Sequence, residues 1–416
     1  MQTQLAESIK YTPVGQEADR ILRSCVHCGF CLATCPTYQL LGDELDSPRG
    51  RIYQIKAVLE GGEATRSTQI HLDRCLTCLS CETTCPSGVQ YGRLLEIGRD
   101  LVDQQVTRPI SERLARFAIR ELVSRREVFR LVLRVGRGLR PLLPRWLKSK
   151  VPMVRRSASV SVMPHARCVI LLKNCVQDAL CPAIDQATAR VLNRLQVRTV
   201  VAADSGCCGA LRAHLSDAEG AQAAARRNID AWWPLLKSGA EAIVMTASGC
   251  GSQVKSYGRL LANDTHYRDR AVQVSAKAVD LSEWLSAQPV DWRANRADSD
   301  TIRVAFQSPC TLQHGQQLRG DIENTLVALG AELTPVADGH LCCGSAGSYS
   351  LLQPALAGSL KDAKLVALMA GSPSVILSAN VGCLSHLQSG AAIPVHHWIE
   401  WVDQRLGGAV RDSDAL

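Results

Sequence analysis

The chain contains few aromatic side chains and no long apolar run. Phe, Trp and Tyr make up 4% of its 416 residues, although 46% of the residues are hydrophobic. No apolar run approaches the roughly 18 residues of a transmembrane helix, and residues 1–22 lack the apolar segment of a signal peptide. We therefore expect about two to four domains with no bilayer-spanning segment. The expected location is cytoplasmic, and a peripheral place on the cytoplasmic face of the inner membrane stays open.

Familiar cofactor and hydrolase motifs are also missing from the sequence. No G-x-G-x-x-G run opens a helix after a strand, and there is no Ser-His-Asp or zinc-hydrolase pattern. Gly344-Ser-Ala-Gly347 is a loop of small residues that is too short to cradle a phosphate. The sequence therefore indicates no hydride-accepting flavin or nicotinamide site of its own. If the chain takes part in redox chemistry, a partner has to oxidise the substrate.

Cysteine, in contrast, is abundant, with 18 residues, and eight of them form two copies of one motif. Each copy reads C-x2-C-x2-C-x3-C-P, the ferredoxin run for [4Fe–4S] clusters, and neither a zinc site nor a disulfide framework requires that spacing. In two-cluster ferredoxins the fourth Cys of each run ligates the other cluster. The predicted ligands are Cys25, Cys28, Cys31 and Cys85 for one cluster and Cys75, Cys78, Cys81 and Cys35 for the other.

The segment that carries both motifs is predicted to be an α-helical ferredoxin domain, residues 1–107. Ser47-Pro48 is typical of a helix start, and Gly61-Gly62 of a helix end, with Ile52, Ile55 and Leu59 at helical spacing between them. His27 lies inside the first cluster loop, where we expect it to hydrogen-bond near a cluster sulfur rather than to act as a ligand.

A strongly basic connector follows at residues 108–165. Residues 108–156 carry 15 Lys and Arg against 3 acidic residues, a net of +12 in a chain whose total is +8. Apolar residues are interleaved with the arginines, which predicts one or two amphipathic helices closed by Pro141 and Pro144. Three roles stay open for the basic face: a solvated cover on a neighbouring domain, a patch for anionic lipid, or a patch for an acidic partner subunit. No nucleic-acid recognition motif accompanies the charge.

An internal duplication fills the rest of the chain, residues 166–295 and 296–416. In both copies 31 residues separate the first Cys from a Cys-Cys-Gly, and 41 and 39 residues then precede the last Cys. Strands alternate with helices, which predicts two parallel α/β domains. The expected strands are Cys168–Leu172, Arg198–Ala203 and Ala242–Thr246, then Ile302–Phe306, Leu333–Val336 and Ser374–Ser378. The fold class is therefore multidomain α+β, a helical dicluster ferredoxin followed by two Cys-Cys-Gly domains.

Each copy places four cysteines after predicted strands, where the site of a parallel sheet forms. The first quartet is Cys175, Cys207, Cys208 and Cys250, and the second quartet is Cys310, Cys342, Cys343 and Cys383. Metal binding competes with inert buried thiols, and it is favoured for the second quartet, as a third [4Fe–4S] cluster or zinc, and slightly disfavoured for the first. His386 is a candidate fifth polar group beside Cys383. Cys168 and Cys181 have no repeat counterpart and are predicted to be structural.

Several segments resemble the iron–sulfur subunits of glycolate dehydrogenase (glycolate oxidase) complexes over essentially the whole chain. They are Cys25–Cys31, Asp46–Tyr53, Asn228–Pro234, Thr246–Gly251 and His340–Gly347. The resemblance implies a complex with two flavoprotein subunits that oxidise glycolate on FAD. This chain would be its electron-transfer subunit and pass electrons to a quinone-type acceptor. The same architecture occurs in glycerol-3-phosphate dehydrogenase, in lactate-utilisation proteins and in heterodisulfide reductase.

One departure from heterodisulfide reductase matters, because its Cys-Cys-Gly domain ends in C-x-x-C. Here the endings are Cys250-Gly-Ser-Gln and Cys383-Leu-Ser-His. Noncubane cluster chemistry and disulfide reduction are therefore put in doubt. Three hypotheses remain: an electron relay without catalytic residues of its own, a thiol–disulfide enzyme, and a zinc-stabilised scaffold.

Overall fold

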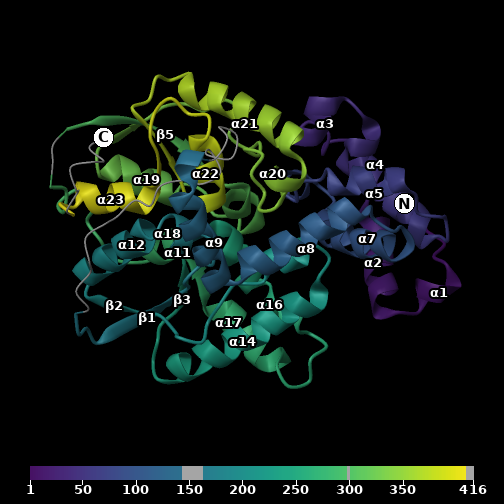
Figure 1. Ribbon diagram of the computed structural model, residues 1–416, viewed down its shortest axis with the longest axis horizontal. Helices are drawn as coiled ribbons and strands as arrows, with labels where there is room; N and C mark the ends of the chain where they lie inside the picture. The colour runs from purple at the N-terminus through teal and green to yellow at the C-terminus, as the bar shows by residue number, and fades with distance from the viewer. Residues whose placement is uncertain (143–162, 298–299, 409–416) are drawn as a thin grey trace.

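The first 107 residues form a helical domain at one end of the molecule (Figure 1). The computed structural model describes residues 1–142, 163–297 and 300–408. The helices of this domain are α1 (Glu7–Lys10), α2 (Pro13–Ser24), α3 (Pro36–Leu41), η1 (Glu44–Asp46), α4 (Pro48–Leu59), α5 (Arg66–Asp73), α6 (Ser80–Thr83) and α7 (Tyr91–Gln105). The helix predicted from Ser47-Pro48 is confirmed as α4, because the Ser47 side chain accepts a hydrogen bond from the Gly50 amide. Buried Ile55 and Leu59 face Leu94 and Leu95 of α7 in the core of the domain.

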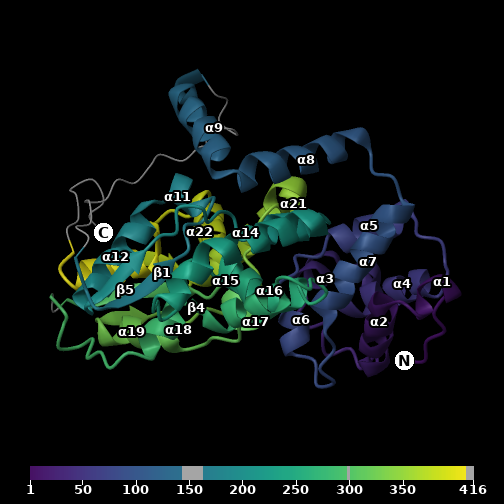
Figure 2. The same ribbon diagram turned by 90° about the horizontal axis from the view of Figure 1, so that it is seen from below.

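The basic connector forms the two predicted helices, α8 (Ile110–Ser124) and α9 (Arg126–Gly138), followed by a short turn η2 (Arg140–Leu142). Figure 2 shows α8 running from the helical domain to the α/β part of the molecule. Pro144, the second expected end signal, lies outside the described residues. Among the described residues, no helix is both long enough and apolar enough to cross a membrane.

Most of the connector arginines that pair with an acid do so with a neighbouring domain. Arg108 and Arg116 bind Asp73 of α5, and Arg130 binds Asp178. The connector therefore covers and ties its neighbours, one of the three roles left open by the sequence. Its outer face is different, because Leu114, Phe117, Leu131 and Val135 are each more than half exposed.

The duplicated part contains two four-stranded parallel sheets of identical topology, with strand orders β2-β1-β3-β4 and β6-β5-β7-β8. The first consists of β1 (Arg167–Leu171), β2 (Val197–Val200), β3 (Ile243–Met245) and β4 (Ala278–Asp280). The second consists of β5 (Ile302–Gln307), β6 (Ala331–Leu333), β7 (Val375–Ser378) and β8 (Val395–His397). The parallel α/β prediction is confirmed for both copies, and the register pairs Ile170 with Ile243 and Ala305 with Ile376.

Helices flank each sheet. The first unit has α11 (Gln177–Leu180), α12 (Ala183–Arg194), α13 (Ala210–His214), α14 (Ala218–Lys237), α15 (Ser248–Lys255), α16 (Tyr257–Leu260), α17 (Arg268–Lys277) and α18 (Leu281–Ser286). The second unit has η3 (Thr311–Gly315), α19 (Asp321–Ala328), α20 (Tyr349–Leu352), α21 (Pro354–Met369), α22 (Val381–Gln388) and α23 (Trp398–Arg405).

Two expected strands end earlier than the sequence predicts. Leu333–Val336 is wrong as a strand, since β6 covers Ala331–Leu333 and Pro335 has no N–H for the ladder. Arg198–Ala203 is cut short, because β2 ends at Val200. The fourth strand of each sheet, β4 and β8, was not predicted. Each has three residues and runs directly into a helix, so no alternating pattern develops.

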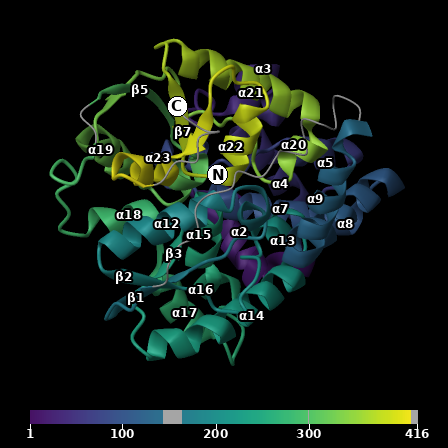
Figure 3. The same ribbon diagram turned by 60° about the vertical axis from the view of Figure 1, so that its left-hand side comes forward.

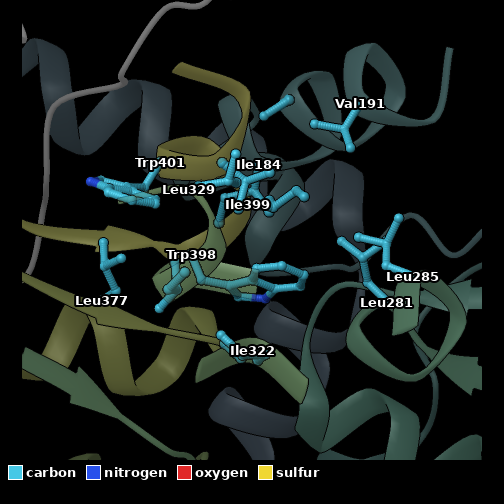
Figure 4. Packing of buried hydrophobic residues seen from close by; sticks show 14 of the residues in the cluster. Ile184, Val191, Leu281, Leu285, Ile322, Leu329, Leu377, Trp398, Ile399 and Trp401 are labelled. Carbon is cyan, nitrogen blue, oxygen red and sulfur yellow. The ribbon is translucent and has the colours of Figure 1, made fainter. Parts of the chain in front are cut away.

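The two α/β units lie against each other and share one hydrophobic core (Figure 3). Equivalent elements meet in reciprocal pairs: α12 packs on α23, and α18 packs on α19. Figure 4 shows this core, where Trp398 and Ile399 of the second unit lie near Ile184 and Leu281 of the first. This packing brings the carboxyl ends of both sheets, with both cysteine quartets, to one shared cavity.

Candidate iron–sulfur centres

The first cysteine motif forms a tight loop at the surface of the helical domain. A small cavity there is lined by the four predicted ligands of one cluster, Cys25, Cys28, Cys31 and Cys85, and also by Cys81 of the second motif. Left-handed backbone at His27 (φ 56°) and Gly29 (φ 87°) turns the loop sharply enough to bring the sulfurs to one side. His27 also lines the cavity, and its Nε2 lies 2.6 Å from Sδ of Met1.

The second motif lies deeper, and its cavity is lined by Cys35, Cys75, Cys78 and Cys81. Cys35 thus lines the cavity of the second motif and Cys85 that of the first, while the assignment of the ligands to two clusters stays a prediction. Hydrogen-bond donors surround these sulfurs. The Tyr91 hydroxyl and the Thr77 amide donate to Cys75 Sγ at 3.5 and 3.4 Å, and Thr37 Oγ1 lies 3.3 Å from Cys35 Sγ.

A buried arginine stands beside the second motif. Arg51 is fully buried and forms an ion pair with Asp46 at 3.1 Å, while its other nitrogens donate to Thr37 Oγ1 and the His71 carbonyl. Burial disfavours its charge, but Tyr91, Cys75, Cys35 and Asp46 together raise the pKa of Arg51. A buried cation of this kind offsets the negative charge that a thiolate-ligated cluster brings into the protein.

Burial dominates the protonation of the motif cysteines. It raises the pKa of Cys31 to about 11 and that of Cys78 and Cys81 well above the ordinary value. Nearby sulfurs raise these pKa values further, because neighbouring thiolates repel one another. Clustered sulfurs in such a site become anionic only when a metal centre takes up their charge. The residues present therefore fit the group that the motifs predict.

The second quartet is buried at the carboxyl ends of β5, β6 and β7. Its sulfurs form a continuous chain of contacts from Cys310 through Cys342 and Cys343 to Cys383. Lys364 of α21 stands beside them, 5% exposed, and donates to the carbonyls of Asp338 and Gly339 at 2.9 and 3.3 Å. Burial lowers the pKa of Lys364, and the sulfurs of Cys310, Cys343 and Cys342 act in the opposite direction.

His386, the candidate fifth group, serves another contact. Its Nε2 lies 3.1 Å from the Ala357 carbonyl oxygen, which ties α22 to α21. Cys168 packs against the core cluster that contains Cys175, Cys207 and Cys208, and Cys181 packs against the one that contains Cys343 and Cys383; their structural role stays a prediction.

The first quartet has the same form in the other unit. Cys175 Sγ lies 3.5 Å from Cys207 Sγ, and contacts continue through Cys208 to Cys250. The contact with Cys207 raises the pKa of Cys175, whereas the hydrogen bonds with Cys175 and Cys208, helped by Arg227 on α14, lower the pKa of Cys207. Tyr257 and Asn228 donate to the carbonyls of Cys208 and Cys207 at 2.8 and 3.1 Å. These hydrogen bonds fix the backbone of the Cys207–Cys208 turn.

None of these sulfur groups has the dimensions of a zinc site. In the part of the chain that the structure describes, the one group of three or more ligating side chains with donor atoms within 4.8 Å of one another is Asp43, Asp46 and His71. A tetrahedral zinc site with bonds of about 2.3 Å to sulfur needs sulfurs about 3.8 Å apart. Asp46 itself is taken up by Arg51 and Arg74. The sulfurs of each quartet therefore lie in an extended row with close neighbours, such as Cys175 and Cys207 at 3.5 Å, rather than in a tetrahedron.

The second quartet adjoins the second ferredoxin motif. Cys78 packs against the buried cluster that contains Cys310 and Cys342, so the two sulfur groups lie side by side. Thr83 of α6 and His314 of η3 join the two domains at 2.8 Å, and His314 Nε2 lies 2.9 Å from the His340 carbonyl oxygen. Cys75, Cys78, the whole first quartet and three cysteines of the second quartet, Cys310, Cys342 and Cys383, line the same shared cavity, whose volume is about 280 Å³.

Several of these residues escaped the sequence analysis. Lys364 is an ordinary helix residue in sequence, and only its burial next to sulfur gives it a role. Arg51 lies within Asp46–Tyr53, one of the segments that carry the family resemblance, but its burial beside the cysteines comes from the fold. A signal for Asn228 was available, since it begins one of the segments that carry the family resemblance.

The comparisons with known proteins agree with this arrangement. A family described as "4Fe-4S dicluster domain" matches residues 21–89, and one described as "Cysteine-rich domain" matches residues 169–255 and 304–388. Among solved structures, a hypothetical protein from Helicobacter pylori is similar, with a TM-score of 0.57 at 8% identity over 98% of this chain and 75% of that chain. That likeness concerns the fold alone.

Fold and site together define an iron–sulfur protein in which a dicluster domain precedes two cysteine-rich domains. Among curated proteins, the "Glycolate oxidase iron-sulfur subunit" of Escherichia coli is 54% identical over 98% of this chain and 99% of its own length. The "Probable glycolate oxidase iron-sulfur subunit" of Bacillus subtilis is 31% identical over 89% of both chains. The chain belongs to the family of glycolate oxidase iron–sulfur subunits, which confirms the resemblance inferred from the sequence.

Proposed function

We propose that this chain is the electron-transfer subunit of a flavin-dependent glycolate dehydrogenase complex. Two FAD-bearing partner subunits oxidise glycolate or a related 2-hydroxy acid, and a quinone-type acceptor receives the electrons. The observation that carries this proposal is the alignment of three cysteine groups, from the surface loop of the first motif through the buried second motif to the second quartet. A flavin site is not indicated by the sequence, which supports substrate oxidation on the partners.

The eight ferredoxin-type cysteines are proposed as ligands in the crossed scheme, with Cys35 and Cys85 exchanged between the motifs. The second quartet is proposed to hold a third [4Fe–4S] cluster. When bound, such clusters supply one-electron transfer. The chain contributes the buried cations Arg51 and Lys364, which balance negative charge, and the donors Tyr91 and Thr77, which fix the sulfurs.

The surface of the first motif is the proposed entry point for electrons. Cys28 is exposed, and Val26, Phe30 and Tyr53 beside it are each more than 60% exposed. Apolar side chains gathered at a redox loop fit the docking surface of a flavoprotein partner. The outer face of α8 and α9, with exposed Arg113, Arg125 and Arg134, is proposed to rest on the anionic cytoplasmic face of the inner membrane.

The test is iron and acid-labile sulfide per chain, with EPR after reduction, on protein purified without oxygen. About twelve iron atoms are expected for three clusters. Cys85→Ser is expected to damage the cluster of Cys25, Cys28 and Cys31, and the matched control Cys168→Ser is expected to change nothing. Stoichiometric zinc with little iron would contradict the relay. Loss of only the neighbouring cluster in Cys85→Ser would contradict the crossed scheme.

A further inference from the structure

Both ferredoxin motifs turn through left-handed backbone at the same two positions. These are His27 and Gly29 in the first motif, with φ of 56° and 87°, and Thr77 and Leu79 in the second motif, with φ of 53° and 62°. Glycine adopts this conformation freely, whereas a β-branched residue such as Thr77 rarely does. The backbone at Thr77 therefore needs support from its surroundings, and residues held in this way cluster at functional sites.

The support comes from Arg99, a partly buried residue of α7. Its Nη1 donates to Thr77 Oγ1 at 3.2 Å, and its Nη2 donates to the carbonyls of Leu72 and Cys75 at 2.8 Å each. Its Nε also donates to the Leu72 carbonyl, at 3.2 Å. The guanidinium thus binds the loop of the second motif at three points around the first cysteine of that motif.

This contact fixes a hydrogen bond to sulfur. In its left-handed conformation, Thr77 donates its amide hydrogen to Cys75 Sγ at 3.4 Å. Hydrogen bonds to the ligand sulfurs are one of the factors that set the reduction potential of an iron–sulfur cluster. They stabilise negative charge on sulfur, and a cluster gains negative charge when it accepts an electron. An amide held on Cys75 Sγ therefore favours the reduced state.

Two residues of α7 converge on the same sulfur. Tyr91 donates its hydroxyl hydrogen directly to Cys75 Sγ at 3.5 Å, whereas Arg99 acts through Thr77. The two residues occupy positions i and i+8 of the helix, which lie on one face. One face of α7 thus supplies both donors with their orientation.

We propose that Arg99 is the positioning residue that tunes the second ferredoxin motif. It holds Thr77 in its left-handed conformation, keeps the Thr77 amide on Cys75 Sγ, and thereby raises the reduction potential of a centre bound by this motif. The second motif then accepts an electron more readily than it would without Arg99. This inference rests on the proposed function, because it requires a cluster in the motif.

Redox titration followed by EPR, on the full-length, cluster-containing chain, tests the role of Arg99. Arg99→Met is expected to lower one midpoint potential by about 59 mV, a tenfold change in a one-electron equilibrium, and to leave the others in place. Arg99→Lys is expected to lower the same potential by more than half of that amount. An ammonium keeps the charge but does not span the three acceptors as the planar fork of arginine does.

Substitutions at Thr77 keep the test decisive if Arg99→Met lowers the iron content. Thr77→Val removes the hydroxyl that Arg99 binds, so the same reduction equilibrium is expected to fall about threefold. Thr77→Ser keeps the hydroxyl and is expected to keep the potential of the unaltered chain. A contact that only fastened α7 to the loop would change the stability or the iron content, but not the potential of an iron-replete variant. An unchanged potential in Thr77→Val would therefore overturn the proposal.

Arg93→Met is the matched control. Arg93 also lies on α7, but it pairs with Glu17 at 2.8 Å and with Glu96 at 3.2 Å instead of with the motif. The variant removes the same charge from the same helix, and each reduction equilibrium is expected to stay within about twofold of its original value. Equal falls in Arg93→Met and Arg99→Met, or an unchanged potential in Arg99→Lys, would assign the effect to charge alone and contradict the positioning role.

Iron content separates this inference from the function on which it rests. Variants that keep their iron and EPR signals but show the lowered potential support the role of Arg99. Unaltered potentials in iron-replete variants overturn that role and leave the relay intact. Little iron in the unaltered chain would overturn the relay, and the inference with it.

Discussion

The two α/β units share a topology but differ in what surrounds their cysteines. The second unit presents its quartet to the ferredoxin domain, where Cys310 packs beside Cys78 and His314 bonds to Thr83. The first unit surrounds its quartet with Asn228, Tyr257 and Arg227, and all four cysteines of that quartet line the shared cavity. A duplication has thus kept one backbone frame while the second copy connects to the relay and the first shapes the cavity.

The same contrast appears at one equivalent position. Asp280 and His397 each end the fourth strand of their sheet and cap the following helix, with Glu283 and Glu400 completing the capping boxes. Burial raises the pKa of Asp280 to about 6 and lowers the pKa of His397 to about 4. Asp280 is therefore neutral below about pH 6, and His397 is neutral above about pH 4.

The largest difference between the units is expected in iron content when the first cysteine of each quartet is replaced. Cys310→Ser should remove about four iron atoms and abolish quinone reduction, because the second quartet adjoins the second motif. Cys175→Ser should leave the iron content unchanged. Iron analysis and EPR of both variants check this, and equal iron loss in the two would show that the units are alike in metal binding.

The capping pair is expected to give opposite responses to pH. His397 stays neutral in the folded chain down to about pH 4, whereas the unfolded chain takes up a proton near pH 6.5, so stability is lost as pH falls through that interval. The full contribution is on the order of 3 kcal/mol. Asp280 holds its proton in the folded chain up to about pH 6, so its contribution is present at low pH and is lost as pH rises.

Urea unfolding at about pH 5 and about pH 6.5 separates the two contributions. His397→Asn is expected to lose less stability on acidification than the unaltered chain, and Asp280→Asn is expected to lose more. If both variants respond to pH as the unaltered chain does, the two side chains titrate normally and the comparison fails at this position.

A smaller effect is expected from the buried lysine of the second unit. Lys364→Met removes a cation beside the second quartet, so the reduction potential of a centre bound there should fall by about 60 mV, a tenfold change in the reduction equilibrium. Redox titration followed by EPR measures this shift. Lys361→Met on the same helix is the control, and an identical shift in both variants would assign the effect to general surface charge.

The smallest effect concerns the connector, which binds acids of the first unit. Arg130→Ala removes the ion pair with Asp178 and is expected to cost at most about 1 kcal/mol, because Arg130 is part exposed. Hydrogen exchange in α11 should become faster, while exchange in α22 of the second unit stays unchanged. Equal changes in both helices would mean that the connector stabilises the two units together.

Local patterns in the sequence predicted the cysteine groups, the start of α4 and the connector helices. The cysteine spacing grouped the sulfurs that the structure brings together, and Ser47-Pro48 marked the start of α4 through the chemistry of a helix cap. The strands β4 and β8 were missed because three residues followed at once by a capped helix show no period of two. The arginine-rich stretch predicted helices but not their partners, since ion pairs such as Arg116 with Asp73 depend on tertiary packing.

The residues missed at the site share a physical reason. Arg51 and Lys364 matter because they are buried near sulfur, and Asn228 and Tyr257 because they hold the carbonyls of the Cys207–Cys208 turn. Neither property is local in sequence, because each requires the packing of distant segments around the sulfurs. The spacing of the ligands can be read from the sequence, whereas the burial and the charges around them depend on the complete fold.

The burial of the second quartet has a consequence for how the protein is made. Cys310 and Cys342 pack against Leu76, Tyr349 and Leu360, so the ferredoxin domain and α21 cover these sulfurs. The cellular machinery that delivers iron and sulfide would have to reach them before that closure. We therefore expect late-stage biogenesis to be ordered, with the innermost centre filled first and docking of the ferredoxin domain sealing it. Chains made under iron starvation should then accumulate as an open, protease-sensitive form.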